Sequence, residues 1–213
     1  MTQILHIDSS ILQDSSVTRL LSAETVRQLA EKLPHATVGY RDLAAEPVPH
    51  LSGEIAAGFR AVPVSTTSED VAAQHQLSEQ LVEEFLASDV IVIGAPMYNF
   101  SVSSQLKSWL DRLAQAGRTF KYTEKGPVGL SGGRTVIIAS ARGGFYHSEP
   151  FSSMDFQERY LSAFFRFLGI TNVHFIRAEG ASKGEEVREH EINTALNSVS
   201  DVIADVTVPQ NQE

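Results

Sequence analysis

The stretch DVIVIGAPMYNF, residues 89–100, decides the fold class of this chain. Its first half holds the run Val90-Ile91-Val92-Ile93 followed by a glycine, a pattern typical of a strand buried on both faces of a parallel sheet. Its second half, residues 95–100, places a proline, a thioether, a phenol, an amide and a phenyl ring directly after that strand. Because ligands bind at the carboxyl edge of open α/β sheets, we expect this loop to contact a ligand.

Other apolar runs along the chain also have strand character, and they alternate with segments of helical spacing. The predicted strands cover residues 3–7, 37–42, 90–93, 135–140 and 173–178, and the predicted helices cover residues 16–33, 70–87, 103–115, 156–168 and 185–206. Strict alternation implies right-handed crossovers, and hence a parallel sheet with helices on both faces. We therefore expect an α/β fold: a doubly wound, five-stranded parallel sheet in the flavodoxin-like order 2-1-3-4-5.

The length of 213 residues fits one domain, 1–213, with an irregular insertion at about 43–69 that is rich in Pro, Ala, Ser and Thr. Long irregular segments in compact domains are usually lids or partner contacts, and a plain surface loop is the alternative. We expect residues 50–68, together with residues 164–167 of a partner subunit, to influence which substrate is accepted. Residues 118–125 are predicted to be extended, and the sequence GPVGLSGG at 126–133 is predicted to form turns.

Composition narrows the range of partners. The formal net charge is −9 and Lys and Arg form no clustered stripe, which argues against nucleic acid and anionic membranes. No apolar run reaches the ~20 residues of a membrane-spanning helix, and the first residues lack the basic start of a secretory signal, so we expect a cytoplasmic protein. The absence of cysteine excludes thiolate chemistry, so any redox reaction requires a bound cofactor.

The segment SSILQDSSVTR, residues 9–19, is a hydroxyl-rich loop that leads into the first predicted helix. Hydroxyl groups, free backbone N–H groups and the positive end of a helix dipole can together hold one phosphate. The segment lacks the glycine patterns that bring the backbone close to a pyrophosphate, which favours a monophosphate. Serines that only cap the helix are the alternative.

Two more loops are expected at the same sheet edge. Residues 95–100 offer aromatic and thioether surface for the face of a flat ring, and polar groups for its edge. The sequence ARGG, residues 141–144, offers two glycines where the backbone can approach a ligand. Simple packing over the sheet and an ordinary Gly-Gly turn are the respective alternatives. Because the strand order brings all three loops together, they predict a mononucleotide that carries an aromatic ring.

Several longer motifs extend over nearly the whole chain. They are SSIL (9–12), RDLA (41–44), APMYNF (95–100), QLK (105–107), AGRTFKYTEKGP (116–127), ARGG (141–144), FLGI (167–170) and AEG (178–180). Through them the chain resembles the FMN-dependent NADH-azoreductase and quinone reductase family of flavodoxin-like proteins. The combination of PMYNF with RTFKYTE at this separation is highly specific.

The resemblance implies one FMN per subunit, NADH or NADPH as electron donor, quinones and azo compounds as acceptors, and a homodimer with the flavins near the subunit interface. It also implies a set of FMN-binding residues: Ser10, Ser15, Ser16 and Val17 for the phosphate, Pro96, Met97, Tyr98, Asn99 and Phe100 for the flavin ring, and Ala141, Arg142, Gly143 and Gly144 as a third FMN loop. Two positions depart from the family pattern. The second Ser of a Ser-x-Ser pair is missing, for which Thr18 is a substitute, and Ala141 stands where Ser is common.

We expect a ping-pong reaction in which the nucleotide delivers a hydride to the flavin and leaves before the acceptor binds. A quinone requires one such cycle and an azo bond requires two. The protein contributes positioning and a dry aromatic slot, and neither a side-chain nucleophile nor a metal is needed. His147 is a candidate proton donor, with an exposed loop histidine as the alternative. Phe120 and Tyr122 are candidate walls of the substrate pocket, with ordinary packing as the alternative.

Three other functions fit parts of the sequence. Asp8-Ser9 with a later Asn is similar to serine esterases on a three-layer α/β plan, but His174 and His190 lack an Asp three residues before them. A receiver-like signalling domain needs a phosphoacceptor Asp at the end of the third strand, where residues 94–95 are Gly-Ala. An electron-transfer flavodoxin, which binds FMN without turning over a substrate, is the remaining alternative.

Overall fold

The computed structural model describes residues 1–59, 68–204 and 206. The main sheet consists of β1 (Gln3–Asp8), β2 (Thr37–Asp42), β3 (Val90–Pro96), β6 (Thr135–Ala141) and β7 (Asn172–Ala178). The longer helices are α1 (Val17–Lys32), α3 (Glu69–Ala87), α4 (Ser104–Leu113), α5 (Phe156–Phe167) and α6 (Glu185–Ala204). The shorter elements are α2 (Gly53–Ala57), single 3-10 turns at Gln13–Ser15 and Ser152–Met154, and a hairpin of β4 (Phe120–Thr123) and β5 (Gly126–Gly129).

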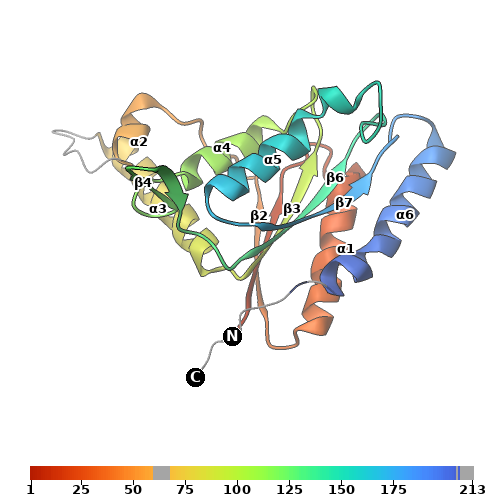
Figure 1. Ribbon diagram of the computed structural model, residues 1–213, viewed down its shortest axis with the longest axis horizontal. Helices are drawn as coiled ribbons and strands as arrows, with labels where there is room; N and C mark the ends of the chain where they lie inside the picture. The colour runs from red at the N-terminus through yellow and green to blue at the C-terminus, as the bar shows by residue number, and fades with distance from the viewer. Residues whose placement is uncertain (60–67, 205, 207–213) are drawn as a thin grey trace.

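The main sheet has the strand order β2-β1-β3-β6-β7, and each neighbouring pair is parallel. This order confirms the predicted flavodoxin-like sheet. Figure 1 shows α1 and α6 side by side on one face of the sheet, with α3, α4 and α5 on the other. Each face has its own apolar core, and every residue of β3 and β6 is buried. The unbroken apolar runs therefore correspond to the central strand β3 and its neighbour β6, as expected for strands covered on both faces.

Most helices begin where the sequence provides a capping side chain. The hydroxyl groups of Ser16, Ser52, Ser68 and Ser103 accept hydrogen bonds from the N–H group three residues later, and the carboxylate of Asp155 accepts two such bonds. These bonds satisfy donors that have no partner within the helix. Together with the apolar periodicity, they place the observed helix ends close to the predicted ones.

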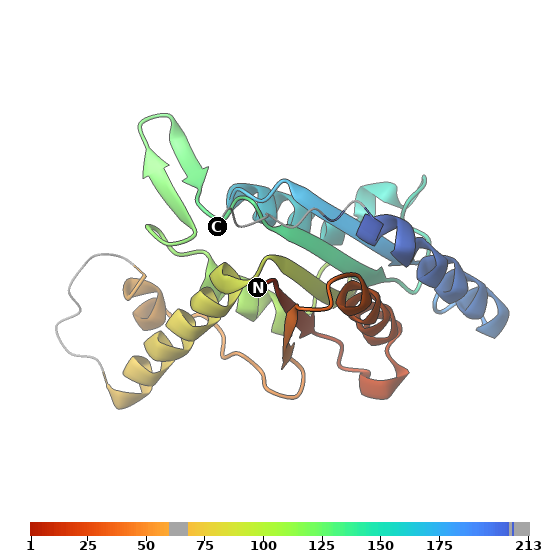
Figure 2. The ribbon, with the colours of Figure 1, turned by 90° about the horizontal axis from the view of Figure 1, so that it is seen from below.

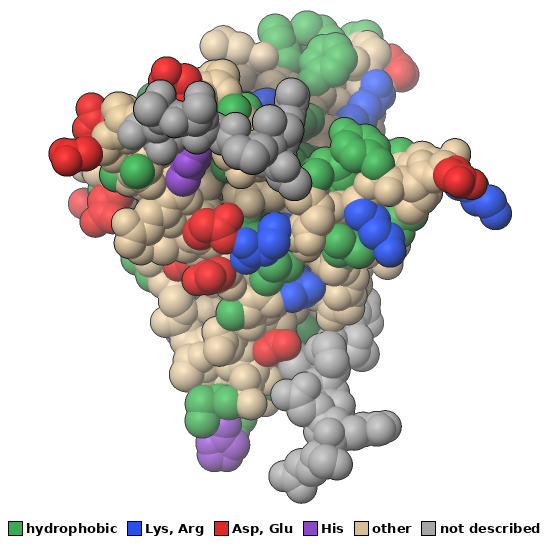
Figure 3. Space-filling view, turned by 90° about the vertical axis from the view of Figure 1, so that its left-hand side faces the viewer, with side chains coloured by type: hydrophobic (Ala, Val, Ile, Leu, Met, Phe, Trp, Pro, Cys, Tyr) green, Lys and Arg blue, Asp and Glu red, His purple; other side chains and the backbone are tan. Residues whose placement is uncertain are grey.

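The prediction for residues 126–133 is wrong in its first half. Residues 126–129 form β5, which pairs antiparallel with β4 around a turn that Gly126 closes with φ +110°. Figure 2 shows this hairpin as an arm that projects from the body of the molecule, and the same arm points to the right in Figure 3. At its base, Gly129 packs directly against the backbone of Gly169, leaving no room for a side chain. This contact between segments far apart in the sequence has no local signature.

The first part of the predicted insertion, residues 43–49, packs against the core and is hydrogen-bonded to α4. Leu43 and Val48 are buried in the core. The guanidinium group of Arg112, on α4, is fully buried and donates hydrogen bonds to the carbonyl groups of Pro49 and Gln74, at 2.9 and 3.1 Å. Residues 60–67 lie outside the described residues, so the role predicted for 50–68 stays a prediction.

The surface carries both signs of charge. On the face shown in Figure 3, acidic and basic side chains are interspersed between exposed hydrophobic groups. Within the described part of the chain, no helix combines the length and the apolar character that crossing a membrane requires.

Candidate functional site

The three predicted loops meet at the carboxyl edge of the sheet. They surround a cavity of about 320 Å³, which we call the edge cavity. It is lined by Ser10, Leu12, Ser15, Ser16, Val17, Thr18, Pro96, Met97, Tyr98, Ala141, Arg142, Gly143, Ala181, Ser182 and Arg188. Ten of the predicted FMN-binding residues are in this lining, whereas Asn99, Phe100 and Gly144 are not.

The serine loop closes one end of the edge cavity at the start of α1. Ser16 caps the helix, because its hydroxyl accepts from the N–H of Arg19 at 3.3 Å, and it also lies 3.0 Å from the hydroxyl of Thr18. Ser16 also lines the cavity, so capping the helix does not exclude the predicted role of this residue in binding a phosphate. Within the described residues, the N–H groups of Val17 and Thr18 make no hydrogen bond. They remain available to an anion at the positive end of the helix.

A buried polar network lies beneath this loop. Asp8, the last residue of β1, is 3% exposed, and its carboxylate accepts from the hydroxyls of Ser22 at 2.8 Å and Tyr40 at 3.2 Å. A Cβ atom on Gly94 would lie 2.3 Å from this carboxylate, which explains the glycine at that position of β3. Ser9 is fully buried and donates to the Gly94 carbonyl at 2.8 Å. A substrate has no access to this hydroxyl, which removes the basis of the esterase alternative.

Arg19 holds the serine loop in place. Its guanidinium forms two contacts with Asp42, at 2.7 and 2.8 Å, and donates to the Ser10 carbonyl at 3.1 Å. The hydrogen bonds between the two side chains raise the pKa of Arg19 and lower the pKa of Asp42. This charge is therefore committed to a structural ion pair.

The loop after β3 is tied to the serine loop. The Tyr98 hydroxyl accepts from the N–H of Ile11 at 3.3 Å and lies 3.3 Å from the hydroxyl of Ser10. Asn99 and Phe100 have φ values of +48° and +72°. For the phenylalanine this left-handed backbone costs about 1–2 kcal/mol, a strain that proteins concentrate at functional sites.

The two glycines of the ARGG loop were expected to let the backbone approach a ligand, but each also lies close to a side chain of the protein. A Cβ atom on Gly143 would lie 2.8 Å from the Ser182 hydroxyl, and one on Gly144 would lie 3.3 Å from the Tyr146 ring. Both glycines thus permit a close approach within the protein, and the predicted approach to a ligand stays a prediction for Gly143, which lines the edge cavity. Arg142 is 1% exposed, and its guanidinium contacts the carboxylates of Asp155, Glu158 and Glu179. Its charge is neutralised within the fold.

Glu179 organises the segment that follows ARGG. Its carboxylate contacts Arg142 and accepts from the N–H of Tyr146 at 2.8 Å and from the ring of His147. Burial alone would raise the pKa of Glu179, but these donors together hold it below the ordinary value of 4.5. The side chain of His147 is 64% exposed and lies outside the cavity lining, so its role as a proton donor stays a prediction.

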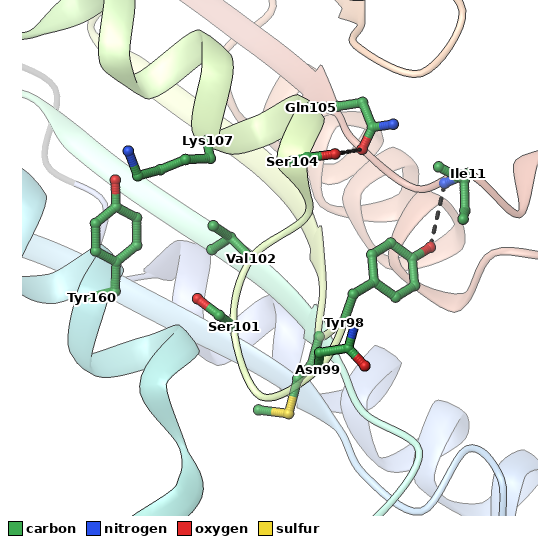
Figure 4. Close-up of a pocket in the computed structure, with 10 residues that line it drawn as sticks. Ile11, Tyr98, Asn99, Ser101, Val102, Ser104, Gln105, Lys107 and Tyr160 are labelled. Carbon is green, nitrogen blue, oxygen red and sulfur yellow. Dashed lines mark hydrogen bonds between the residues drawn. The ribbon is translucent and has the colours of Figure 1, made fainter. Parts of the chain in front are cut away.

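A second hollow of about 730 Å³ adjoins the edge cavity and shares Met97 and Tyr98 with it. Figure 4 shows Lys107 and Tyr160 with their polar ends toward each other on one side of this hollow, and Tyr98 reaching to Ile11 on the other. The hollow is wide enough for a flat acceptor beside a ring in the edge cavity.

The two candidate pocket walls, Phe120 and Tyr122, line neither hollow within this chain. Phe120 is buried against Phe167, with 4.6 Å between ring centroids, whereas Tyr122 on the projecting hairpin is 75% exposed. The role of the two residues stays a prediction that depends on a second subunit.

A fourth loop completes the edge cavity, and the sequence reasoning missed it. Ala181 and Ser182 follow β7 and donate backbone hydrogen bonds to the carbonyls of Arg142 and Gly143, at 2.9 and 3.1 Å. Arg188, in the first turns of α6, adds a guanidinium to the lining. The available signal was the fifth strand itself, because its loop opens at the same edge as the loops after the first, third and fourth predicted strands.

Two named bacterial proteins are similar to this chain over nearly its full length. The chain is 57% identical over 201 residues to the FMN-dependent NADH:quinone oxidoreductase of Ralstonia nicotianae, covering 94% of this chain and 97% of that protein. It is 55% identical over 204 residues to FMN-dependent NADH:quinone oxidoreductase 2 of Xanthomonas euvesicatoria, covering 96% and 94%.

Solved structures extend the comparison to three dimensions. An azoreductase from Bacillus anthracis superposes with a TM-score of 0.88 at 27% identity, over 97% of this chain and all of that one. An FMN-dependent NADH-azoreductase from the same species, solved with FMN, superposes with a TM-score of 0.84 at 25% identity, over 95% and 99%. The Flavodoxin_2 family model, described as flavodoxin-like fold, matches residues 2–203. This chain therefore belongs to the flavodoxin-like fold family.

Proposed function

We propose that this chain is an FMN-dependent NADH:quinone oxidoreductase that also reduces azo compounds. The observation that carries the proposal is the edge cavity, in which a hydroxyl-rich helix start, the Met97–Tyr98 segment and the ARGG loop surround one space. Two relatives named FMN-dependent NADH:quinone oxidoreductase, which match nearly the full length at 55–57% identity, support the quinone activity. Two similar solved structures named azoreductases, at 25–27% identity, support the azo activity.

The edge cavity fits a flavin mononucleotide. Its phosphate would be held by the Ser16 and Thr18 hydroxyls and by the free N–H groups at the start of α1, a donor set suited to one phosphate. The flavin ring would lie against Pro96, Met97 and Tyr98, where a thioether and an aromatic side chain offer apolar contact. Asn99, Phe100 and Gly144 would contribute at the rim, since they adjoin the lining in the sequence.

FMN, when bound, supplies the ability to take up a hydride and to deliver it to a second substrate. The contribution of the chain is positioning. Tyr98 couples the ring-binding loop to the serine loop, and Arg19 fixes the Ser10 carbonyl, so that the two halves of the site keep one relative position. The adjoining hollow lies open to solvent-borne molecules and would receive NADH and the acceptor in turn.

Because NADH and the acceptor would bind at the same place, the reaction would be ping-pong, and NAD⁺ would leave before the acceptor enters. A quinone consumes one NADH. An azo bond consumes two NADH and is cleaved to two amines. Steady-state initial rates at several fixed quinone concentrations should therefore give parallel double-reciprocal lines, and intersecting lines would contradict the shared place.

A homodimer is part of the proposal. The hairpin of β4 and β5 projects from the body and exposes Tyr122, although an isolated two-stranded hairpin has little stability of its own. A second subunit would cover it and bring Phe120 and Tyr122 toward a flavin. Light scattering at micromolar concentration should give twice the chain mass of 23.3 kDa.

The decisive test uses the purified full chain. Its visible spectrum is recorded before and after addition of FMN, NADH is then added without oxygen, and a quinone is added last. We expect FMN uptake, bleaching by NADH and restoration of the colour by the quinone. A chain that takes up no FMN would refute the proposal. A chain that takes up FMN but does not turn over NADH with a quinone would instead be an electron-transfer flavodoxin.

A further inference from the structure

The phosphate of a bound FMN poses a charge problem for this chain. A phosphate monoester carries a charge of about −1.5 to −2 at pH 7. The protein itself has a formal net charge of −9. The serine loop provides hydroxyls and N–H groups but no side-chain cation to the edge cavity, because the Arg19 guanidinium is paired with Asp42. Within the described lining, a side-chain cation for the phosphate can therefore come only from outside the serine loop.

The described lining of the edge cavity contains two arginines, and only one of them has a charge to offer. Arg142 is 1% exposed and contacts three carboxylates. Arg188 has a single carboxylate neighbour in the described structure, Glu185, at 3.5 Å, and that carboxylate is 73% exposed. Such a contact is longer than a hydrogen bond and is weakened by solvent. The guanidinium of Arg188 is therefore free to exchange Glu185 for a stronger anion.

The fold brings Arg188 into the same cavity lining as the start of α1. It lies in the first turns of α6, which runs alongside α1 on the same face of the sheet in Figure 1. The same lining contains Ser15, Ser16 and Thr18 at the start of α1. A guanidinium that joins these groups adds a planar pair of donors and a full charge, which suits a phosphate.

We propose that Arg188 binds the phosphate group of FMN and thereby selects FMN over flavins that lack a phosphate. This inference rests on the proposed function, since it assigns a residue to the same cofactor site. It predicts that Arg188 contributes to the affinity for FMN and contributes nothing to the affinity for riboflavin, which has the same ring and no phosphate.

The test compares two ligands and three variants. Flavin is removed from the purified full chain, and binding of FMN or riboflavin is followed by the change in flavin fluorescence. R188Q removes the positive charge, and R188K retains the charge but lacks the planar pair of donors of a guanidinium. R27Q is the matched control, because Arg27 is also a helical arginine paired with glutamates, but it lies outside the edge cavity. Thermal unfolding of each variant reports on the fold.

For R188Q we expect the Kd of FMN to rise about 10- to 100-fold, the range of a lost charged hydrogen bond, with the Kd of riboflavin unchanged within about twofold. R188K should lie between R188Q and the wild type, and R27Q should match the wild type for both ligands. The dependence of the FMN Kd on salt should be weaker in R188Q, because one ionic contact is missing.

Glu185 provides a change of opposite sign. E185Q removes the competing carboxylate, so the affinity for FMN should stay the same or rise, by up to about threefold for an exposed ion pair. The inference is overturned if R188Q binds FMN as the wild type does, or if it loses FMN and riboflavin to the same extent. A wild-type chain that binds neither flavin would instead refute the proposed function, and the inference with it.

Discussion

The contact between Gly129 and Gly169 allows a quantitative prediction about the projecting hairpin. In G129A the new Cβ atom would lie 2.0 Å from the backbone nitrogen of Gly169 and 2.2 Å from the carbonyl carbon of Leu168, whereas ordinary contacts begin at 3.4 Å. One of the two backbones has to retreat by about 1.4 Å, and neither is the flexible end of a side chain.

Overpacking of this kind costs about 2–3 kcal/mol. For a chain of this length, that loss lowers the Tm by about 5–10 °C, which thermal unfolding followed by circular dichroism detects readily. Two controls separate the clash from other effects of the substitution. G53A meets no atom within 4 Å, and G133A meets none either but forces a Cβ onto a backbone with φ +83°, at a cost of about 1 kcal/mol.

The same variant tests what the hairpin does. Because the hairpin does not line the edge cavity of its own chain, the Kd of FMN in G129A should change less than kcat/KM for a quinone. If the hairpin covers the flavin of a second subunit, as proposed, kcat/KM for a quinone should fall. A Tm within 1 °C of the G53A value would refute the packing argument. A lowered Tm with unchanged kcat/KM would refute the proposed role of the hairpin.

Three further predictions concern single side chains. Arg112 is fully buried and, within the described residues, donates to uncharged acceptors on three residues. R112M leaves these buried acceptors without a donor and should lose about 3 kcal/mol in urea denaturation, and a loss below about 1 kcal/mol would contradict its role as an anchor. In Y98F the contacts of the hydroxyl with Ser10 and Ile11 disappear. FMN should then bind about 2- to 10-fold more weakly, with little change in Tm. An unchanged Kd would show that these two contacts do not contribute to FMN binding. The pKa of Glu179 is lower in the folded chain than its ordinary value of 4.5, so its stabilising contribution is complete above pH 4.5 and is lost as the pH falls through the folded pKa. Stability measured against pH should therefore fall less steeply below pH 4.5 in E179Q than in the wild type, and parallel profiles would contradict this linkage.

The strand order and the place of the site could be predicted because both depend on short-range patterns. A strand covered on both faces requires an uninterrupted apolar run, and Val90–Ile93 is such a run along the chain itself. Alternation with amphipathic helices then restricts the connections to right-handed crossovers, and these bring the loops at Ser10, Met97 and Ala141 to one edge. The capping serines also act within three residues of their own position.

The partners that individual side chains contact could not be predicted in this way. Arg142 looked like a group available to a ligand, but its charge is neutralised by carboxylates from the N-cap and first turn of α5 and from the residue after β7. Gly143 lines the edge cavity as expected, but the close neighbour that requires a glycine there is Ser182, a residue that the local sequence does not indicate. Each outcome depends on a partner that is distant in sequence, and the local sequence does not indicate which partner arrives.

The sequence by itself thus determined the α/β class, the order of the sheet and the edge at which the cavity opens, because apolar periodicity and helix caps are local properties. Only the tertiary structure decided which cations remain free to meet a ligand and which side chains close the cavity. It showed that Arg19 and Arg142 are paired within the protein while Arg188 faces the edge cavity with one weak partner. The physical reason is that the availability of a charge depends on every group packed around it, and that packing is assembled from segments that are far apart in the chain.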